Sequence, residues 1–289
     1  MLRMSAPIGH HLQVGPDKET ERAELLRKAA TMAVDTITIK SVPADWTDNH
    51  CREARAFLDA NGLRVGEFTG FVKGKGSAGG LGAWDQEDYD NTLEIYRRQL
   101  RQAKLLGAHF VGFALLVGIR TPAMWSNETW ERCLKAIGEL VQEAEKVGID
   151  VGAHPHVMTP IHSVDRYKDM LDRIPSPRLK VLIDPVNMVW PHLIYQTDRL
   201  LNDIFDALGE QIIGVHAKDV VISGGGKVIT HVDEAVPGQG NMDYFTMARR
   251  LGALKQDVTV HAEHFPYAET IQGQEYIRSV GRQVGVEIR

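Results

Sequence analysis

The chain has 289 residues, 43% of them hydrophobic and 25% charged, with a net charge of −5, which is ordinary for a globular protein. A mildly acidic chain gives no reason to expect nucleic acid or a membrane surface as a partner. Cys51 and Cys133 are too few and too far apart for a disulfide framework or a thiolate zinc site. No apolar run is long enough to span a bilayer, and residues 1–15 lack the apolar core of a secretion signal. We therefore expect a cytoplasmic protein.

Apolar, β-branched runs alternate with amphipathic runs along the whole chain. Strands are predicted at residues 3–8, 36–40, 63–68, 109–116, 149–153, 179–184, 212–217 and 258–262. Helices are predicted at residues 17–33, 48–61, 88–106, 127–147, 163–174, 198–208, 242–254 and 268–284. Such alternation requires right-handed parallel crossovers. Eight units in this length favour an α/β fold, a closed (β/α)8 TIM barrel formed by residues 1–289 as one domain. A doubly wound sheet is less favoured, because no Gly-x-Gly-x-x-Gly follows the first strand.

Glycine marks both helix ends and long connections in this pattern. Gly107 and Gly148 follow predicted helices, where glycine commonly ends a helix. Two glycine-rich segments, residues 70–82 and 223–240, are too long for tight turns, and loops of this length are usually functional. We expect both to be loops that cover the site and select the substrate.

Four predicted strands in the C-terminal half end on side chains that can bind a metal. These residues are His154, Asp184, His216 and Glu263. Because the carboxyl ends of barrel strands face one crater, we expect the four to converge. Two imidazoles and two carboxylates suit a divalent cation, whose charge would offset the cost of burying the acids. Each residue alone has a structural alternative, such as a hydrogen-bonded histidine or a capping aspartate, and only their combination favours a metal site.

Four motifs resemble the xylose-isomerase-like TIM barrels, the sugar isomerase and epimerase superfamily. They are Asp184-Pro-Val-Asn187, His216-Ala-Lys-Asp219, Pro237-Gly-Gln-Gly240 and Ala262-Glu263-His264. Within the superfamily the pattern is most similar to the catalytic subunit of C-glycoside deglycosidases and related 3-oxo-glycoside lyases. That subgroup usually ends strand five with Glu-Pro-His, whereas this chain has His154-Pro155-His156. A histidine therefore replaces the first metal-binding glutamate.

The resemblance implies a metal-dependent proton abstraction. The additional nitrogen ligand favours manganese first, with cobalt, iron or zinc as alternatives, over magnesium; Glu67 is a stand-in ligand should His154 not bind. A cation bound to a carbonyl and its neighbouring hydroxyl stabilises the enediolate that forms when the α-proton leaves. The implied base is His156, because imidazole titrates near neutrality; the alternative is that it orients Asp184 or a water.

Lys218 is the second candidate catalytic residue, since its charge would offset charge on a substrate oxygen, unless it instead pairs with Asp219. Further side chains are expected to bind substrate or support the ligands. These are Glu67, Asn187, His231, Glu234 and His264.

The expected substrate is a small keto-sugar or oxidised glycoside. Return of the proton to the enediolate gives an isomerase or epimerase, and expulsion of a β-substituent gives a lyase, which the subgroup resemblance favours. Two alternatives remain open at this point. One is a DNA-directed member of the superfamily, disfavoured by the acidic charge; the other is a non-catalytic barrel subunit with a decayed metal site. The sequence also leaves open a homo-oligomer or a small accessory subunit.

Overall fold

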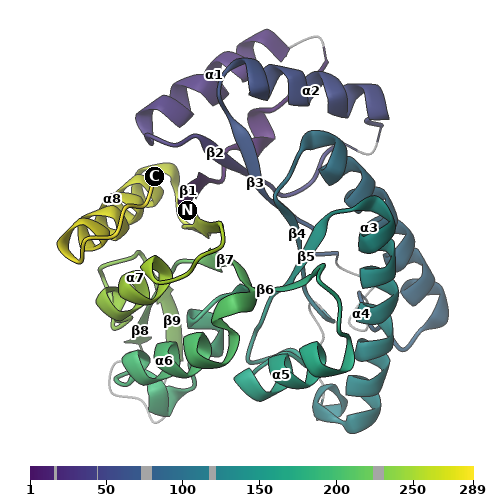
Figure 1. The fold of residues 1–289 in the computed structure, drawn as a ribbon, viewed down its shortest axis with the longest axis vertical. Coiled ribbons are helices and arrows are strands. Elements are labelled where there is room, and N and C mark those ends of the chain that lie inside the picture. The colour runs from purple at the N-terminus through teal and green to yellow at the C-terminus, as the bar shows by residue number, and fades with distance from the viewer. Residues whose placement is uncertain (16–17, 44, 73–79, 117–121, 224–230) are drawn as a thin grey trace.

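The computed structural model describes residues 1–15, 18–43, 45–72, 80–116, 122–223 and 231–289. Eight parallel strands close into a barrel in the hydrogen-bonded order β1-β10-β7-β6-β5-β4-β3-β2, surrounded by helices (Figure 1). The barrel strands are β1 (Leu2–Ala6), β2 (Thr36–Ile39), β3 (Arg64–Thr69), β4 (Phe110–Phe113), β5 (Asp150–Ala153), β6 (Leu179–Ile183), β7 (Ile212–His216) and β10 (Val258–His261). This confirms the predicted closed (β/α)8 barrel.

The outer layer of the barrel is formed by α-helices. They are α1 (Lys18–Thr31), α2 (Asp48–Ala60), α3 (Gln86–Leu106), α4 (Asn127–Val147), α5 (Val164–Arg173), α6 (Thr197–Leu208), α7 (Tyr244–Gly252) and α8 (Tyr267–Gln283). Gly107 and Gly148 end α3 and α4 with φ angles of 71° and 75°, the left-handed conformation that glycine adopts at low cost. No described helix is long and apolar enough to cross a membrane.

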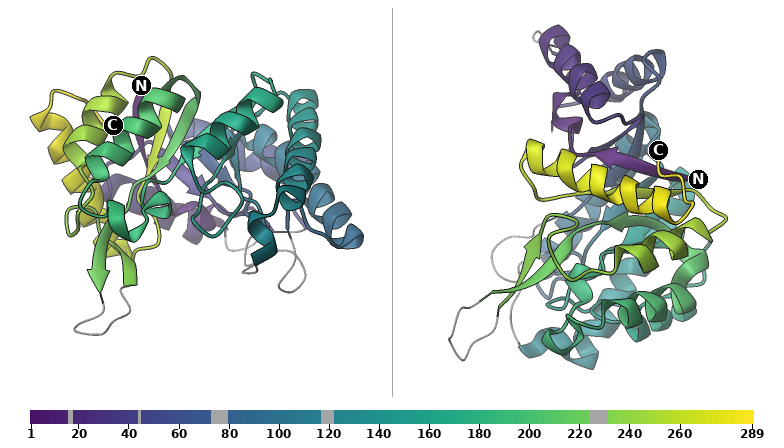
Figure 2. Two further views of the ribbon diagram at one scale, coloured as in Figure 1. Left: turned by 90° about the horizontal axis from the view of Figure 1, so that it is seen from below. Right: turned by 90° about the vertical axis from the view of Figure 1, so that its left-hand side faces the viewer.

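The prediction of a continuous loop over residues 223–240 is wrong. Strands β8 (Asp219–Ser223) and β9 (His231–Ala235) pair there as an antiparallel ribbon, which projects from the body at the end opposite the chain termini (Figure 2). Glycines dominated the reading of this segment, whereas Val220, Val221 and Ile222 just before it supply the β-branched residues that favour a strand. Residues 224–230, and residues 73–79 of the other predicted loop, lie outside the described part of the chain.

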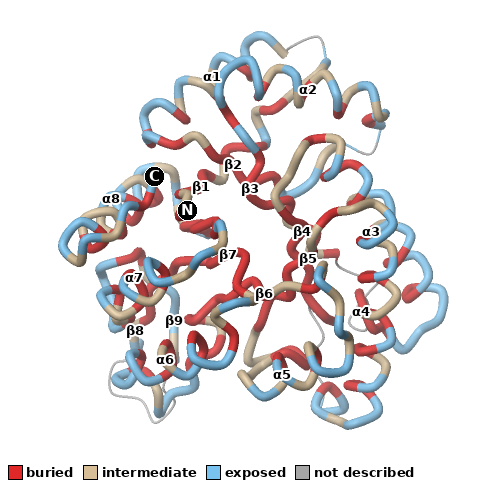
Figure 3. The backbone as a smooth tube through the Cα atoms, viewed as in Figure 1, coloured by how far each residue is buried: buried red, intermediate tan, exposed pale blue. Residues whose placement is uncertain are grey.

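Buried residues follow the barrel strands and the inner faces of the helices (Figure 3). Inside the barrel, Phe110, Leu182 and Ile213 form a separate apolar cluster. Strand β7 makes room for it with Gly214, where an added Cβ would lie 2.6 Å from Phe110 Cζ. Gly112 on β4 similarly leaves space for a carboxylate, because a Cβ there would lie 2.7 Å from Glu67 Oε1. The strands thus bring polar groups close to an apolar barrel interior.

Candidate metal centre

The four predicted ligands converge. His154 and Asp184 directly follow β5 and β6, His216 ends β7, and Glu263 lies just beyond β10. One ligand atom from each residue lies within 4.8 Å of those of the others, and all four residues are buried. Parallel strand ends meeting at one rim produce this cluster.

Hydrogen bonds fix the ends of two of these strands. The Tyr167 hydroxyl on α5 lies 2.9 Å from the carbonyl oxygen of Ala153 and 3.2 Å from that of Leu182. The His154 backbone N–H donates to the Phe113 carbonyl at 2.8 Å. Tyr167 is fully buried, so this side chain ties β5 to β6 immediately before His154 and Asp184.

The distances among the four side chains fit a shared cation. His154 Nε2 lies 3.2 Å from Asp184 Oδ2, and His216 Nδ1 lies 2.9 Å from Glu263 Oε1 and 3.8 Å from Asp184 Oδ2. Among the described residues, His216 Nδ1 is buried without a hydrogen-bond partner. A nitrogen that faces two carboxylates without a hydrogen bond is suited to a cation between them. Two nitrogens and two oxygens form a donor set typical of divalent transition metals.

Glu67 lies on the other side of the His216 ring. Its Oε2 is 2.9 Å from His216 Nε2 and 3.7 Å from His261 Nδ1, and its Oε1 accepts a hydrogen bond from the Thr69 hydroxyl at 2.9 Å. With His216 and His261 it forms a second group of potential ligands. A carboxylate that accepts the proton on Nε2 leaves the lone pair of Nδ1 for a metal. Glu67 therefore lies at the Nε2 side of His216, whereas Asp184 and Glu263 lie at its Nδ1 side.

Lys218 reaches into the same cluster. Its Nζ lies 2.9 Å from Asp184 Oδ2, 3.4 Å from Glu263 Oε1 and 3.3 Å from Glu234 Oε1, and it donates to Asn187 Oδ1 at 3.2 Å. The side chain is fully buried. Lys218 thus contacts three carboxylates, those of Asp184 after β6, Glu234 on β9 and Glu263 after β10.

Asp219 is not the partner of Lys218 but anchors the following loop. Its carboxylate accepts four backbone hydrogen bonds at 2.8–3.0 Å, from the N–H groups of Val220, Gly238, Gly240 and Met242. The Tyr244 hydroxyl donates to the Lys218 carbonyl at 2.8 Å. Sequence analysis did not assign this role; the signal for it was an aspartate followed by the glycines of Pro237–Gly240, whose amides can approach a carboxylate closely.

The carboxylates of the cluster stay ionised despite burial. Burial alone would raise the pKa of Asp184, but the charge of Lys218 and the hydrogen bond with His154 lower that pKa to about 2. Burial likewise opposes ionisation of Glu263, yet His216 holds its pKa well below the usual range. The pKa of Lys218 is raised, because the carboxylates of Asp184 and Glu263 outweigh its burial. Lys218 is therefore a permanent cation.

The cluster is nevertheless short of positive charge. Burial would lower the pKa of His216, but Glu263 and Glu67 raise it well above its ordinary value. In contrast, burial dominates at His154 and lowers its pKa in spite of the Asp184 hydrogen bond. The carboxylates of Glu263 and Glu67 thus attract positive charge to His216, in addition to the charge that the Lys218 ammonium supplies. A divalent cation would supply the missing charge.

His264 and Glu234 extend the cluster towards the surface. His264 Nδ1 lies 2.9 Å from Glu234 Oε2, and its Nε2 lies 3.5 Å from Glu263 Oε2. Glu234 is on β9, so the ribbon brings it next to Lys218. His231 is exposed at the start of β9, opposite Ser223, and no described contact joins it to the cluster.

Asn187 and His156 flank the His154 side. The Asn187 amide donates to the Pro155 carbonyl at 3.3 Å, and its backbone N–H donates to Asp184 Oδ1 at 3.2 Å. His156 Nδ1 accepts a hydrogen bond from the Met158 backbone N–H at 2.9 Å. In the neutral ring this contact favours the tautomer with its hydrogen on Nε2.

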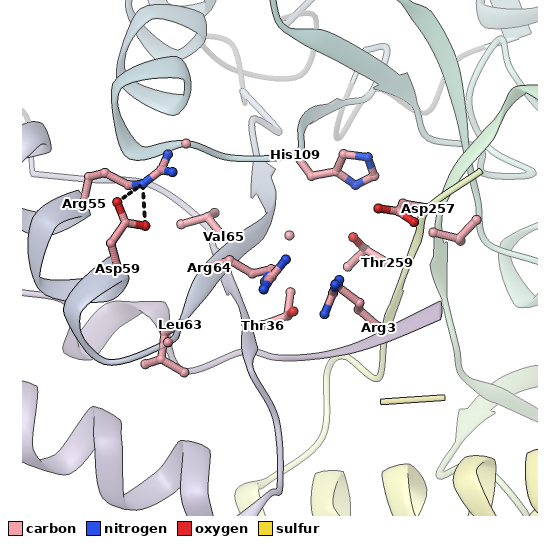
Figure 4. Close-up of a pocket in the computed structure, with 14 residues that line it drawn as sticks. Arg3, Thr36, Arg55, Asp59, Leu63, Arg64, Val65, His109, Asp257 and Thr259 are labelled. Carbon is pink, nitrogen blue, oxygen red and sulfur yellow. Dashed lines mark hydrogen bonds and ion pairs between the residues drawn. The ribbon is translucent and has the colours of Figure 1, made fainter. Parts of the chain in front are cut away.

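A cavity of about 400 Å³ lies away from the cluster, at the N-terminal ends of the strands (Figure 4). Its charged groups are paired: Arg55 Nε donates to both Asp59 oxygens at 2.8 Å, and Arg3 Nη1 lies 2.6 Å from Asp35 Oδ2. In barrels of this kind the N-terminal end of the strands serves stability rather than catalysis. We therefore place the candidate site at the opposite rim.

Comparisons with known proteins agree with the fold. Residues 26–280 match the family described as Xylose isomerase-like TIM barrel, while no curated protein sequence gives a significant match. An L-ribulose 3-epimerase is similar at 15% identity and a TM-score of 0.72, covering 99% of this chain and 96% of its own. A Xylose isomerase-like TIM barrel protein from Mycobacterium smegmatis, in complex with magnesium, is similar at 16% identity and a TM-score of 0.71, and the match covers 98% of this chain and 97% of the other. The 3-keto-D-glucoside 4-epimerase of E. coli is similar at 16% identity and a TM-score of 0.66, and the match covers 96% of this chain and 100% of the other. The family match spans most of the sequence, and the chain therefore belongs to the xylose isomerase-like TIM barrels.

Proposed function

We propose that this protein is a divalent-metal-dependent enzyme that removes the proton α to the carbonyl of a keto-sugar or an oxidised glycoside. The observation that carries the proposal is the buried group of His154, Asp184, His216 and Glu263, in which His216 Nδ1 faces carboxylates without a hydrogen bond. Solved structures with this fold include sugar epimerases, which supports sugar as the substrate class.

These four side chains would hold the cation, and we propose manganese first, with cobalt, iron or zinc as alternatives. Two imidazole nitrogens favour these metals over magnesium, although one similar structure contains magnesium. When bound, the metal supplies Lewis-acid polarisation of the substrate carbonyl and stabilises the negative charge that develops on its oxygens.

Lys218 would contribute a second positive charge. Its raised pKa makes it a hydrogen-bond donor rather than a base. Because Asp184, Glu234 and Asn187 hold its Nζ from different sides, the ammonium is fixed in place before substrate arrives, and such preorganised charge is the most effective kind.

His156 remains the proposed residue for proton transfer, with a constraint from its hydrogen bond. Since Nδ1 accepts from Met158 N–H, the neutral ring carries its hydrogen on Nε2 and can donate a hydrogen bond to a substrate oxygen. To act first as the base, the ring would have to exchange that contact for a proton on Nδ1. We therefore expect His156→Ala to lower turnover by roughly 10²–10⁴-fold while the metal stays bound. Loss of the metal in this variant would instead identify His156 as a ligand.

Two outcomes of the same proton removal lead to different products. We propose the lyase outcome, expulsion of the group β to the carbonyl, because the sequence motifs resemble the 3-oxo-glycoside lyases and C-glycoside deglycosidases. The second candidate is an epimerase or isomerase, which the activity of the E. coli 3-keto-D-glucoside 4-epimerase on a similar fold favours.

A substrate screen with isotope exchange tests this proposal. The protein is loaded with manganese, cobalt, iron or zinc and incubated in D2O with 3-oxo-glycosides, free ketoses and ketose phosphates. We expect metal-dependent loss of the α C–H signal by NMR, with aglycone release for a lyase and an epimeric sugar for an epimerase. Failure to bind any of these metals, together with no exchange, would favour a non-catalytic barrel.

A further inference from the structure

A second cavity, of about 410 Å³, opens on the same rim as the metal cluster. Its described lining comes from the segments that follow β1, β2 and β10, with one residue from β2 itself. The lining residues are Pro7, His10, Thr38, Lys40, Ser41, His264 and Phe265. A volume of this order is enough for one end of a small ligand.

His264 connects this cavity to the metal cluster. It lines the cavity, and its Nε2 lies 3.5 Å from Oε2 of the candidate ligand Glu263. His264 also has a φ angle of 72°, which is uncommon for a residue other than glycine and costs conformational energy. The fold therefore accepts strain at the residue that lies between the two sites. One ligand could contact both.

The charge of the cavity is opposite to that of the metal cluster. None of its seven described lining residues is acidic, whereas one, Lys40, is permanently basic. Lys40 is exposed and has no hydrogen bond or ion pair with any described residue. This distinguishes it from Lys218, whose charge is taken up by Asp184, Glu234 and Glu263.

Ser41 is the polar side chain near Lys40 that has no hydrogen bond with the described residues through its hydroxyl. Ser41 presents a hydroxyl and His10 an imidazole, whereas the buried Thr38 hydroxyl is already hydrogen-bonded to that of Ser5 at 2.7 Å. Burial, and next the charges of His11 and Lys28, lower the pKa of His10, while a hydrogen bond to the Pro7 backbone opposes them; the neutral ring therefore adds no charge, and its N–H is already used by Pro7. The Lys40 ammonium, with the Ser41 hydroxyl and no acidic residue in the described lining, suits a phosphate or carboxylate.

His10 is held by a fixed neighbour. Its ring lies 4.0 Å from that of His11, centroid to centroid. Both ring nitrogens of His11 are engaged, with Nδ1 2.6 Å from Glu21 Oε2 and Nε2 2.9 Å from Lys28 Nζ. This wall of the cavity is therefore formed in advance of any ligand, which reduces the entropy cost of binding.

We propose that this cavity binds an anionic group, a phosphate or a carboxylate, carried by the sugar whose carbonyl end lies at the metal cluster. The inference rests on the proposed function for the carbonyl end alone; recognition of the anion by Lys40 is a separate property. It makes the substrate an acidic or phosphorylated sugar derivative rather than a neutral one.

Binding of sn-glycerol 3-phosphate, with glycerate as the carboxylate probe and glycerol as the neutral one, tests the proposal. Calorimetry is performed on the full chain, both metal-loaded and chelated, for wild type, Lys40→Met and Lys255→Met. Lys255 is an exposed lysine that precedes β10 at the opposite end of the barrel, so its substitution is a matched loss of charge. We expect an anionic probe to bind more tightly than glycerol, and Lys40→Met to weaken that binding by about tenfold or more. Lys255→Met should leave it unchanged.

The outcomes separate this inference from the proposed function. Lys40-dependent binding of either anion in the chelated protein supports it even where no metal-dependent exchange is found; the tighter of the two probes identifies phosphate or carboxylate. Binding that is lost on chelation but insensitive to Lys40→Met would place the anion on the metal and overturn the inference. Equal binding of glycerol and both anions would overturn it too.

Discussion

The two ends of the barrel both gather charged side chains, but they arrange them differently. At the N-terminal end Arg55 and Asp59 form an exposed pair, with 43% and 56% of their side chains accessible. At the C-terminal end Lys218 and Asp184 are 2.9 Å apart and both fully buried. An exposed pair is screened by water and contributes little, whereas each buried charge depends on all of its neighbours. The comparison teaches that the C-terminal cluster, with its buried carboxylates, is the end of the barrel that could hold a cation.

The sharpest way to break this contrast is Asp184→Ala. The substitution leaves Lys218 and the remaining ligands without a central carboxylate, and removing one partner of a buried ion pair destabilises by about 3–5 kcal/mol. We expect both the denaturant midpoint and the metal content to fall. Metal analysis and equilibrium unfolding of the same preparation measure the two effects.

The matched control for Asp184→Ala is Asp150→Ala. Asp150 begins β5 at the other end of the barrel and pairs with Arg178 at 2.8 Å, and 23% and 41% of the two side chains are exposed. This variant should retain its metal and lose about 1 kcal/mol or less. An unchanged midpoint and full metal occupancy in Asp184→Ala would remove Asp184 from the proposed site.

Glu67→Gln sharpens the comparison within the C-terminal cluster. If Glu67 acts by holding the proton of His216 Nε2, the Glu67→Gln protein should bind metal roughly 10–100-fold more weakly, as for other partners of metal-bound histidines. Titration with cobalt gives the affinity, and the cobalt absorption spectrum reports the ligand set. Glu131→Gln, an exposed substitution of the same charge, is the control.

The spectrum decides between two roles for Glu67. A weaker affinity with an unchanged spectrum is expected for a residue that acts through His216. A changed spectrum would make Glu67 a direct ligand, as the sequence-based alternative to His154 supposed. An affinity equal to that of the wild type would leave Glu67 with a packing role against Gly112 only.

The four candidate ligands could be predicted because each lies at the end of an apolar run, and parallel strand ends must share a rim. The role of Glu67 could not, because its partner His216 is 149 residues away and the β2–β3 register shifts between Ile37 and Thr38. No local pattern shows which side chain lies across a barrel. The position of Glu67 was therefore read only as a strand end.

Neighbouring residues were also misread where the chain changes direction. Lys218 and Asp219 are adjacent in sequence, which suggested a pair, yet Lys218 Nζ contacts Asp184 and the Asp219 carboxylate accepts backbone N–H groups of the following loop. Consecutive side chains in extended backbone point to opposite sides. The motif His216-Ala-Lys-Asp219 therefore contains two separate roles: Lys218 contacts the cluster, and Asp219 holds the following loop.

The smallest effect is expected from Asp59→Asn at the N-terminal cavity (Figure 4). Asp59 pairs with Arg55, four residues before it on α2, and such a pair contributes about 0.3–0.5 kcal/mol on exposed helix faces. The variant should therefore unfold almost as the wild type does and keep its metal. Unfolding in low salt and in high salt then separates the two ends of the barrel. Mobile ions screen exposed charges far more than buried ones, so the effect of Asp59→Asn should vanish in high salt while that of Asp184→Ala persists. A large, salt-independent loss in Asp59→Asn would mean that the N-terminal cavity, too, depends on a buried network, and the contrast between the two ends would no longer hold.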